Sequence, residues 1–302
     1  MNIVKLIHNP SAGDEEHTGD HLVQHITNAG FECRYSSTNE EEWKDIESDI
    51  DFIAIAGGDG TVRKVVKRIL KKNLQQLPFT VLALGTANNI AKTFDIDNDT
   101  KKTVDGWKQA SVKSIDIGAI ENVPDENFFL EGIGFGIFPY LMKEMKKAET
   151  VFASPEEELQ AALKKLHNIL LEYEPRQCHL EVDGTDHSGK FFMVEVMNIR
   201  SIGPNMMLAP QADPGDGELE IVLIPEAHKQ KFSEFLIHRI AGGEDNFQFH
   251  TLKGKKIQIK WSGIRLHVDD KMLKMEKEAE IKIEVREKAL KFLKNEPVQK
   301  SD

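Results

Sequence analysis

Residues 57–61 form the stretch of this chain whose composition is best suited to binding a charged ligand. The stretch reads Gly57-Gly58-Asp59-Gly60-Thr61. It follows an apolar run over 52–56 that is typical of a buried strand, and apolar residues recur at helical spacing from Val62 to Leu70. Glycines let a backbone approach a ligand closely, and a helix N-terminus presents N–H groups and the positive end of a dipole. The pattern predicts a phosphate site, and the Asp and Thr inside the turn favour this prediction over a merely connecting turn.

Two more loops of small and polar residues follow predicted strands. One comes after the strand predicted at 3–7 and reads Asn9-Pro10-Ser11-Ala12-Gly13. The other comes after the strand predicted at 79–84 and reads Gly85-Thr86-Ala87-Asn88-Asn89. Strands at 3–7, 31–35, 52–56 and 79–84 that alternate with helical patterns indicate a parallel sheet covered on both faces. Because open α/β sheets bind ligands beyond the carboxyl ends of their strands, we expect the three loops to lie at one site.

The chain has 302 residues, a length that favours two domains. From residue 113 onward the predicted segments are short strands separated by turns, which is typical of an antiparallel sandwich or barrel. A charged, helix-rich insertion interrupts them at 140–174, and Pro155 lies at a predicted helix start. A last helix is predicted at 286–293. We therefore expect an α/β domain over 1–112 plus 286–302, with the terminal helix packed on it, and a β domain over 113–285.

The composition is that of an ordinary globular protein, with 40% apolar residues, 29% charged residues and a net charge of −11. The negative charge argues against nucleic acid as the main partner. The two cysteines, Cys33 and Cys178, lie far apart, so we expect reduced thiols rather than a disulfide framework. Neither a signal peptide nor a membrane-spanning run is recognisable, which predicts a cytoplasmic protein. A lipid substrate would then be met at the membrane surface, and the sequence leaves a homodimer open.

Three carboxylates occur within six residues in the segment that runs from Asp213 to Glu218 and includes Asp216. Oxygen ligands packed in this way suit a hard cation such as Mg²⁺. A solvated acidic turn explains the same pattern, so the residues alone leave both interpretations open. Just upstream, Met206 and Met207 could line a pocket for an acyl chain, although burial in an ordinary core is the more common role of methionine.

The order and spacing of these motifs resemble the catalytic domain of diacylglycerol kinases. The three loops and the downstream pairs Ala209-Pro210 and Asp216-Gly217 together cover most of the chain. The combination is most similar to the soluble bacterial lipid kinases of this superfamily, which also contains sphingosine and ceramide kinases. The resemblance implies an α/β nucleotide-binding domain with a doubly wound parallel sheet, as in NAD kinases and diacylglycerol kinases, followed by a C-terminal antiparallel β-sandwich domain. It also implies that ATP and a lipid acceptor meet between the two domains.

The resemblance further implies roles for particular residues. Asp59 would be catalytic by organising Mg²⁺ at the phosphates of ATP. The acidic segment would hold a structural magnesium through Asp213, Asp216 and Glu218. The ATP site would be lined by Asn9, Pro10, Ser11, Ala12, Gly13, Thr38, Gly57, Gly58, Gly60, Thr61, Val62, Arg63, Thr86 and Asn88.

At three positions the chain departs from the pattern of the family, and each departure removes a negative charge from the expected site. Lys64 and Asn89 stand where relatives commonly have acidic residues. Lys271 stands where the family has the glutamate that accepts a proton. A lysine is a poor base at neutral pH unless burial lowers its pKa.

The neighbours of Lys271 offer a substitute for the missing base. Asp270 and Asp269 are adjacent and carry the right chemistry, so either could be catalytic. The two residues could instead simply form the turn of a hairpin. His267 beside them could relay protons, but a surface histidine on a strand is the preferred prediction.

We therefore predict an ATP-dependent lipid kinase that transfers the γ-phosphoryl group of magnesium–ATP to a lipid hydroxyl, and two alternatives stay open. NAD kinases share the Gly-Gly-Asp-Gly turn and a two-domain plan, although the loops at 9–13 and 85–89 favour the lipid branch. The second alternative is a nucleotide-binding regulatory protein that has lost phosphoryl transfer along with the three acidic positions.

Overall fold

The computed structural model describes residues 2–13, 17–147, 152, 154–243, 247–278 and 280–296. The chain divides into two compact units. The first unit is Met1–Ile115 with Lys288–Asp302, and the second is Asp116–Glu287. The sequence places the corresponding domain boundaries after residues 112 and 285. Of the predicted segments, residues 148–151 and 153 of the insertion and 297–302 at the C-terminus lie outside the described residues.

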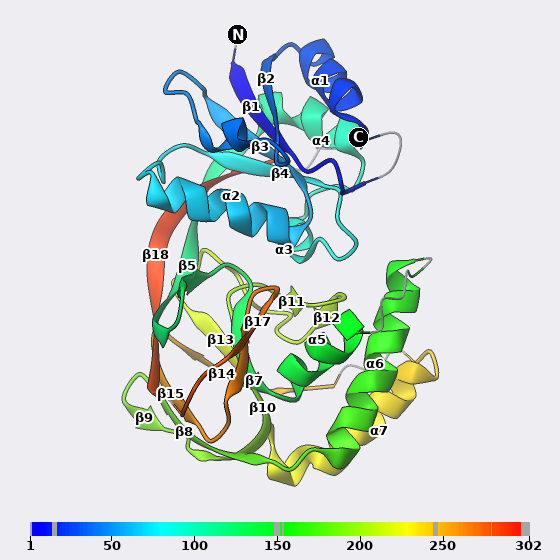
Figure 1. Cartoon of the computed structure of the whole chain (residues 1–302), viewed down its shortest axis with the longest axis vertical. Coiled ribbons are helices and arrows are strands. Elements are labelled where there is room, and N and C mark those ends of the chain that lie inside the picture. The colour runs from blue at the N-terminus through cyan, green and yellow to red at the C-terminus, as the bar shows by residue number, and fades with distance from the viewer. Residues whose placement is uncertain are drawn as a thin grey trace, which may run out of the picture. The chain divides into compact units, whose positions relative to one another are not determined.

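The first unit is built on parallel strands in the order β2-β1-β3-β4-β18. These strands are β1 (Ile3–His8), β2 (Glu32–Ser37), β3 (Phe52–Gly57), β4 (Phe79–Ala83) and the C-terminal part of β18 (Glu280–Lys294). The central strands read as continuous apolar runs because helices cover both faces of the sheet. α1 (Gly19–Asn28) and α4 (Thr100–Gly106) cover one face, and α2 (Asp59–Lys71) covers the other (Figure 1). The predicted parallel sheet is confirmed.

Shorter elements complete the first unit. α2 begins directly after β3 and Gly58, so the strand, turn and helix predicted over 52–70 are confirmed. α3 (Asn89–Thr93) begins inside the loop that follows β4. Single turns of 3-10 helix occur at Glu41–Lys44 and Trp107–Gln109.

The predicted C-terminal helix at 286–293 is wrong, because this segment belongs to β18. The last residues of β18 add a parallel strand to the first unit, with Phe292 in register with Phe79. The Phe292 ring packs edge-on against Phe79 at 5.3 Å and stacks on Phe94 at 4.0 Å, measured between ring centroids. Helix propensity is a weak local preference, and the burial of this aromatic side chain in a long-range strand pairing overrides it.

The second unit is an antiparallel β structure, as predicted. Its main path is β17-β16-β7-β10-β8-β15-β18, and β13 pairs with both β10 and β14. β5 (Ser111–Val123) begins in the first unit and continues into the second at Asp116. The other strands are β6 (Glu126–Phe129), β7 (Gly132–Gly136), β8 (Arg176–Val182), β9 (Thr185–Asp186), β10 (Gly189–Met197), β11 (Ser201–Ile202), β12 (Met206–Met207), β13 (Leu219–Pro225), β14 (His250–Gly254), β15 (Lys256–Trp261), β16 (Arg265–Val268) and β17 (Lys271–Lys274).

Helices cover one face of β10 and β13 in the second unit. They are α5 (Ile137–Lys147), α6 (Pro155–Glu172) and α7 (Lys229–Ile240), which follows a 3-10 turn at Glu226–His228. β10 is buried on both sides as a result. Val194 and Val196 belong to the core between the strands, whereas Met193 and Met197 belong to the core under the helices.

The helix start predicted near Pro155 is confirmed. The Ser154 hydroxyl accepts a hydrogen bond from the Glu157 N–H at 3.2 Å, and Pro155 occupies the first turn of α6. The run Glu156–Glu158 then places negative charge at the positive end of the helix dipole. No helix among the described residues combines the length and apolar character needed to cross a bilayer.

Candidate functional site

Two glycine turns of the first unit touch through their backbones. A Cβ atom at Gly85 would lie 2.5 Å from the Cα of Gly58, and a Cβ at Gly58 would lie 3.1 Å from the Cα of Gly85. Both contacts are with backbone atoms, which cannot move aside as the end of a long side chain can. The two glycines are therefore required for the close approach between the turns after β3 and β4.

The Asp59 carboxylate ties these turns together. Its Oδ2 accepts a hydrogen bond from the Asn89 N–H at 2.9 Å, and its Oδ1 accepts one from the Ile90 N–H at 3.0 Å. Both N–H groups belong to the first turn of α3, where a helix cannot satisfy its own amides. The turn after β4 is closed by Asn88, whose Oδ1 accepts from the Gly85 N–H at 2.9 Å and whose Nδ2 donates to the Gly85 carbonyl at 2.6 Å. Asp59 thus has a structural role in this site.

The loop at 9–13 is joined to the same place. The Asn9 Nδ2 donates to the Thr61 Oγ1 at 3.2 Å, and the Asn9 N–H donates to the Ala56 carbonyl at 2.9 Å. The Thr38 N–H donates to the His8 carbonyl at 2.7 Å, which joins the ends of β1 and β2. The structure therefore brings the three predicted loops together at the carboxyl ends of β1, β3 and β4.

The residues predicted to line an ATP site differ in their exposure. The exposed members are Pro10, Ser11, Gly13, Gly60 and Thr86. The partly exposed members are Asn9, Ala12, Thr38, Gly58 and Thr61. The buried members are Gly57, Val62, Arg63 and Asn88. Members of the first two groups can contact a ligand, whereas the buried ones support the turns from below.

His8, at the end of β1, is a buried polar residue that the sequence motifs do not single out. Its Nδ1 lies 3.2 Å from the Tyr35 hydroxyl, and its Nε2 has no hydrogen-bond partner in the part of the chain that the structure describes. Burial lowers the pKa of His8, and the nearby charge of His17 lowers it further. The position of His8 at the end of a strand, directly before Asn9, is the feature of the sequence that could have identified it.

In the second unit, Asp269 and Asp270 form the two-residue turn between β16 and β17. Asp269 is buried in a left-handed conformation with a φ of 51°. Its carboxylate accepts hydrogen bonds from the N–H groups of Leu130 at 3.1 Å, Glu131 at 2.8 Å and Gly132 at 3.2 Å. Asp270 is exposed. The hairpin turn considered from the sequence is therefore present, and its two carboxylates have different surroundings.

A buried ion pair lies behind this turn. The His267 Nε2 is 2.8 Å from the Glu195 Oε2, and the His267 Nδ1 is 2.9 Å from the Asp269 carbonyl. The prediction of a surface histidine is wrong, because His267 is 1% exposed and Glu195 is fully buried. A Cβ at Gly134 would lie 1.9 Å from the Glu195 carboxylate, so the glycine of β7 leaves the room that this pair occupies.

The pKa values of both members of this pair are raised. Burial raises the pKa of Glu195, and the neighbouring His267 only partly opposes that shift. Burial opposes charge on His267 as well, but the Glu195 carboxylate and its hydrogen bond raise the pKa of His267 overall. The sequence alone gives no sign of this pair, except that Glu195 lies within an apolar run.

Lys271, which stands where the resemblance places a glutamate, has a carboxylate as its partner. Its Nζ lies 2.9 Å from the Oε1 of Glu126 on β6. The Glu126 side chain is 1% exposed, whereas the Lys271 side chain is 47% exposed. The position therefore carries an ammonium group that offsets the charge of a buried glutamate from another strand.

The acidic segment at 213–218 forms a turn that is held by its own backbone. The Asp213 Oδ1 accepts from the Gly215 N–H at 3.0 Å, and the Asp216 Oδ1 accepts from the Glu218 N–H at 3.0 Å. The buried Asp116 anchors the turn, since its Oδ2 accepts from the Gly217 N–H at 2.9 Å. No group of three or more Asp, Glu, His or Cys side chains among the described residues is placed to hold a metal ion.

A large cavity lies entirely within the second unit and has a volume of about 950 Å³. Its apolar lining comes from α6, α7, the segment around β12 and the segment before β14, and includes Leu159, Leu163, Met206, Leu208, Phe235, Phe247 and Phe249. The charged side chains of Glu220, Arg239 and Lys253 also line it. Met207 also lines it and is 60% exposed. Both methionines line the cavity, but Met206 is also buried in the core under the helices, which is the more common role considered from the sequence.

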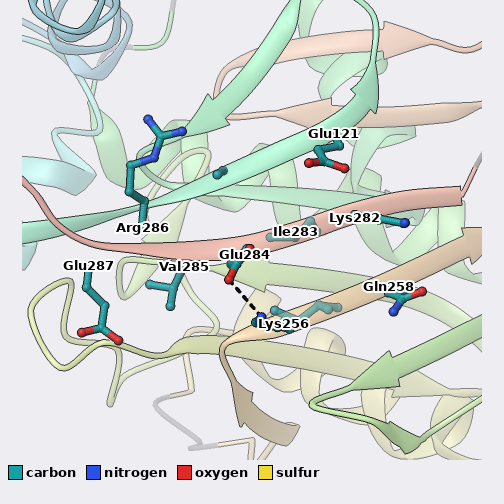
Figure 2. A pocket seen from close by; sticks show the side chains of 11 residues that line it. Glu121, Lys256, Gln258, Lys282, Ile283, Glu284, Val285, Arg286 and Glu287 are labelled. Atoms are coloured by element: carbon teal, nitrogen blue, oxygen red, sulfur yellow. Dashed lines mark ion pairs between the residues drawn. The ribbon is translucent and has the colours of Figure 1, made fainter. Parts of the chain in front are cut away.

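A second cavity of the same unit, of about 630 Å³, has a different character. It lies beside β5, β15 and β18 and is lined by charged side chains of both signs (Figure 2). Lys256 and Glu284 face each other there at 3.3 Å. None of its described lining residues belongs to the predicted sites, and its mixed charge suits neither an anionic phosphate nor an acyl chain.

Comparison with known families divides the chain at a similar place. A model of the diacylglycerol kinase catalytic domain matches residues 4–120. A model of the YegS C-terminal NAD kinase beta sandwich-like domain matches residues 145–293. The two matches together span most of both units.

Individual proteins also match over most of the chain. A diacylglycerol kinase of Bacillus subtilis (strain 168) is 25% identical over 285 residues, which cover 90% of this chain and 88% of that protein. A solved structure from Bacillus anthracis strain Sterne has the same fold, with a TM-score of 0.74 at 19% identity and 97% coverage of both chains. A diacylglycerol kinase structure from that organism has a TM-score of 0.71 at 18% identity, again with 97% coverage of both chains.

Proposed function

Because the chain belongs to the diacylglycerol kinase catalytic-domain superfamily, we propose that it is an ATP-dependent lipid kinase. It would transfer the γ-phosphoryl group of magnesium–ATP to the hydroxyl group of a lipid. The observation that carries the proposal is the backbone contact between the glycine turn that precedes α2 and the one that precedes α3, which Asp59 ties together. Close backbone approach beside a helix N-terminus is a site that suits phosphate groups.

In this proposal the nucleotide binds to the first unit. The phosphates lie against the turn at 57–61, and the hydroxyl groups of Thr61 and Ser11 are within the loops that would surround them. An ionised carboxylate has about four acceptor positions, so Asp59 can accept a hydrogen bond from a water of magnesium–ATP while it holds α3. Magnesium, when bound with the nucleotide, supplies charge neutralisation at the phosphates.

The acceptor part of the proposal is based on the large cavity of the second unit. Its volume of about 950 Å³ falls within the range of ligand sites, and its lining of Leu, Met and Phe side chains suits an acyl chain. Methionine adapts to irregular apolar shapes, and the exposed Met207 lies where a chain could enter. We propose that this chain is cytoplasmic and that it takes its lipid from the membrane surface into this cavity.

Asp270 is the proposed acceptor for the proton of the lipid hydroxyl. Its side chain is exposed at the turn, whereas the Asp269 carboxylate is engaged by three backbone N–H groups. Asp269 would then be a positioning residue. Phosphoryl transfer depends mainly on positioning and charge neutralisation, so a weak base is sufficient in place of the family glutamate.

One observation favours a second candidate, a nucleotide-binding protein without transferase activity. Asp59 and Asp269, two of the three acidic residues predicted to be catalytic, use their carboxylates to hold backbone N–H groups. Lys271 in turn is paired with Glu126. Such a protein would be stabilised by ATP through mass action and would show no turnover.

The test is transfer of labelled γ-phosphate from magnesium–ATP to a mixed lipid extract and, separately, to NAD, with counting of the organic and aqueous phases. We expect label in the organic phase, and we expect Asp270→Asn to lose that label while ATP still raises its Tm. Asp59→Asn should lose both responses, because its turn contact is weakened. Asp105→Asn, an exposed change on α4, is the matched control.

The other outcomes of this assay are equally informative. Label in NADP would contradict the lipid assignment and identify an NAD kinase-like enzyme. A rise in Tm with ATP, but no label in any acceptor, would support the non-catalytic candidate.

A further inference from the structure

The acidic turn of the second unit already contains a cation from its own chain. The ammonium group of Lys253 on β14 lies 3.0 Å from the Asp216 Oδ2 and 3.1 Å from the Glu220 Oε1. It is also 4.0 Å from the Glu218 Oε2. Lys253 and Glu220 face each other in the register of β13 and β14, so the sheet itself fixes the position of this ammonium group.

The carboxylates are arranged around Lys253 rather than around a common point between themselves. The Glu220 side chain is 6% exposed, so its charge needs a partner within the protein. Asp213 and Asp216 each use one oxygen to accept an N–H of their own turn. Two of the three predicted ligands, Asp216 and Glu218, lie 3.0 and 4.0 Å from the Lys253 ammonium group, so a magnesium ion bound by both would have to displace Lys253. The residues present therefore do not fit the structural metal ion that the family resemblance implies.

We infer that the Lys253 ammonium group takes the place of that metal ion and makes the second unit independent of a divalent cation. A lysine can do this because its ammonium group is a compact charge, which here donates a hydrogen bond to Asp216 and forms an ion pair with Glu220 at 3.1 Å. The inference concerns the stability of the folded chain, and it does not depend on the proposed kinase activity.

The experiment measures Tm in the absence of nucleotide, with EDTA or with Mg²⁺, for the wild type and for Lys253→Met. The wild-type Tm should be the same in both conditions. Lys253→Met should lower Tm by about 4 °C or more, since it leaves Glu220 buried without a partner. Mg²⁺ should raise the Tm of this variant, because the carboxylates are then open to another cation. Lys256→Met removes an exposed lysine paired with Glu284, and should show neither effect.

Three results would overturn the inference. A wild-type Tm that rises with Mg²⁺, and no longer does so in Asp216→Asn, would restore the magnesium site at the acidic turn. A Lys253→Met protein as stable as the wild type would show that the ammonium group is not needed. A destabilised Lys253→Met protein that ignores Mg²⁺ would show that the turn is not a cation site.

If Lys253→Met does not fold, Lys253→Arg takes its place. This variant keeps a cation on the same strand, so its Tm should remain insensitive to EDTA. A Lys253→Arg protein whose Tm depends on Mg²⁺ would contradict the inference, and the wild-type comparison is decisive in either case.

Discussion

The two units hold their chemically important residues in different ways. In the first unit, the backbone brings the predicted loops together, through glycines in direct contact and through Asp59 bound to amide N–H groups. The second unit also uses backbone N–H groups, at Asp269, but it pairs two other buried carboxylates with side chains from other strands. Glu195 is paired with His267, and Glu126 is paired with Lys271. A close backbone contact tolerates few residue types at its positions, whereas the two residues of an ion pair can be replaced if both change together.

This difference explains which departures from the family pattern the fold tolerates. Asn89 replaces an acidic residue, but the group that contacts Asp59 is the N–H of Asn89, which any residue other than proline provides. Lys271 replaces an acidic residue at a position where Glu126 brings a carboxylate from β6. Gly58 and Gly85, by contrast, have no side chain to exchange, and both are present.

The largest effect should come from breaking the backbone contact with Gly85→Ala. The added methyl would lie 2.5 Å from the Cα of Gly58, so the turns must move apart. Because a displacement of about 1 Å in a positioned site costs about 100-fold in rate, we expect at least that loss in labelled phosphate transfer. The rise in Tm with ATP should also disappear. Gly189→Ala, whose methyl would meet only the Phe191 ring at 3.3 Å, is the control and should retain both.

A change of charge at position 271 tests the side-chain ion pairs of the second unit. Lys271→Glu restores the family residue but places it beside the buried Glu126, so we expect a loss of about 1–3 kcal/mol in the free energy of unfolding. That range allows for the partial exposure of residue 271. Adding Glu126→Gln should recover most of the loss, which urea unfolding can measure.

Lys274→Glu is the control for this exchange, because it reverses an exposed charge on the same strand. It should change the urea midpoint little. If Lys271→Glu is as stable as the wild type, the Lys271–Glu126 pair does not determine which residue position 271 accepts.

Stability of the second unit should fall as the pH rises, because of Glu195 and His267. The folded-state pKa of His267 is raised, so its contribution is complete below about pH 6.5, the unfolded value, and is lost as the pH rises through the folded value. Glu195→Gln should remove this loss, which we expect to be on the order of 1 kcal/mol in the free energy of unfolding. Urea unfolding from acidic to alkaline pH measures it, and equal slopes in both proteins would refute the assignment.

The first unit should show a smaller dependence of the opposite sign. The folded-state pKa of His8 is lowered by burial, so stability is lost as the pH falls from about 6.5 through the folded value. His8→Asn should reduce this loss in the free energy of unfolding at acidic pH by less than about 1 kcal/mol. His179→Asn, an exposed change, is the matched control. If His8→Asn and the wild type lose the same stability at acidic pH, groups other than His8 cause the loss.

The sequence predicts the loops of the first unit because their signals are local. A buried strand, a turn with three glycines and a helical pattern follow one another over 52–70, and each is visible without knowledge of the rest. The ion pairs of the second unit could not be predicted in this way. Lys271 and Glu126 are 145 residues apart, and their contact depends on the order of strands in the sheet. The contacts of Lys253 also join residues that are far apart in the sequence. So does the buried pair of His267 and Glu195, for which Gly134 leaves room.

The course of β18 has a consequence for how the chain folds as it is made. Residues 280–287 of this strand belong to the second unit, and the residues that follow complete the sheet of the first unit beside β4. Because β18 follows the other strands of both units in the chain, the N-terminal sheet stays unfinished, with the β4 edge unpaired, until the residues around Phe292 have been synthesised. A chain that stops before Glu280 would therefore leave both units incomplete, and the two cannot be separated by a single cut.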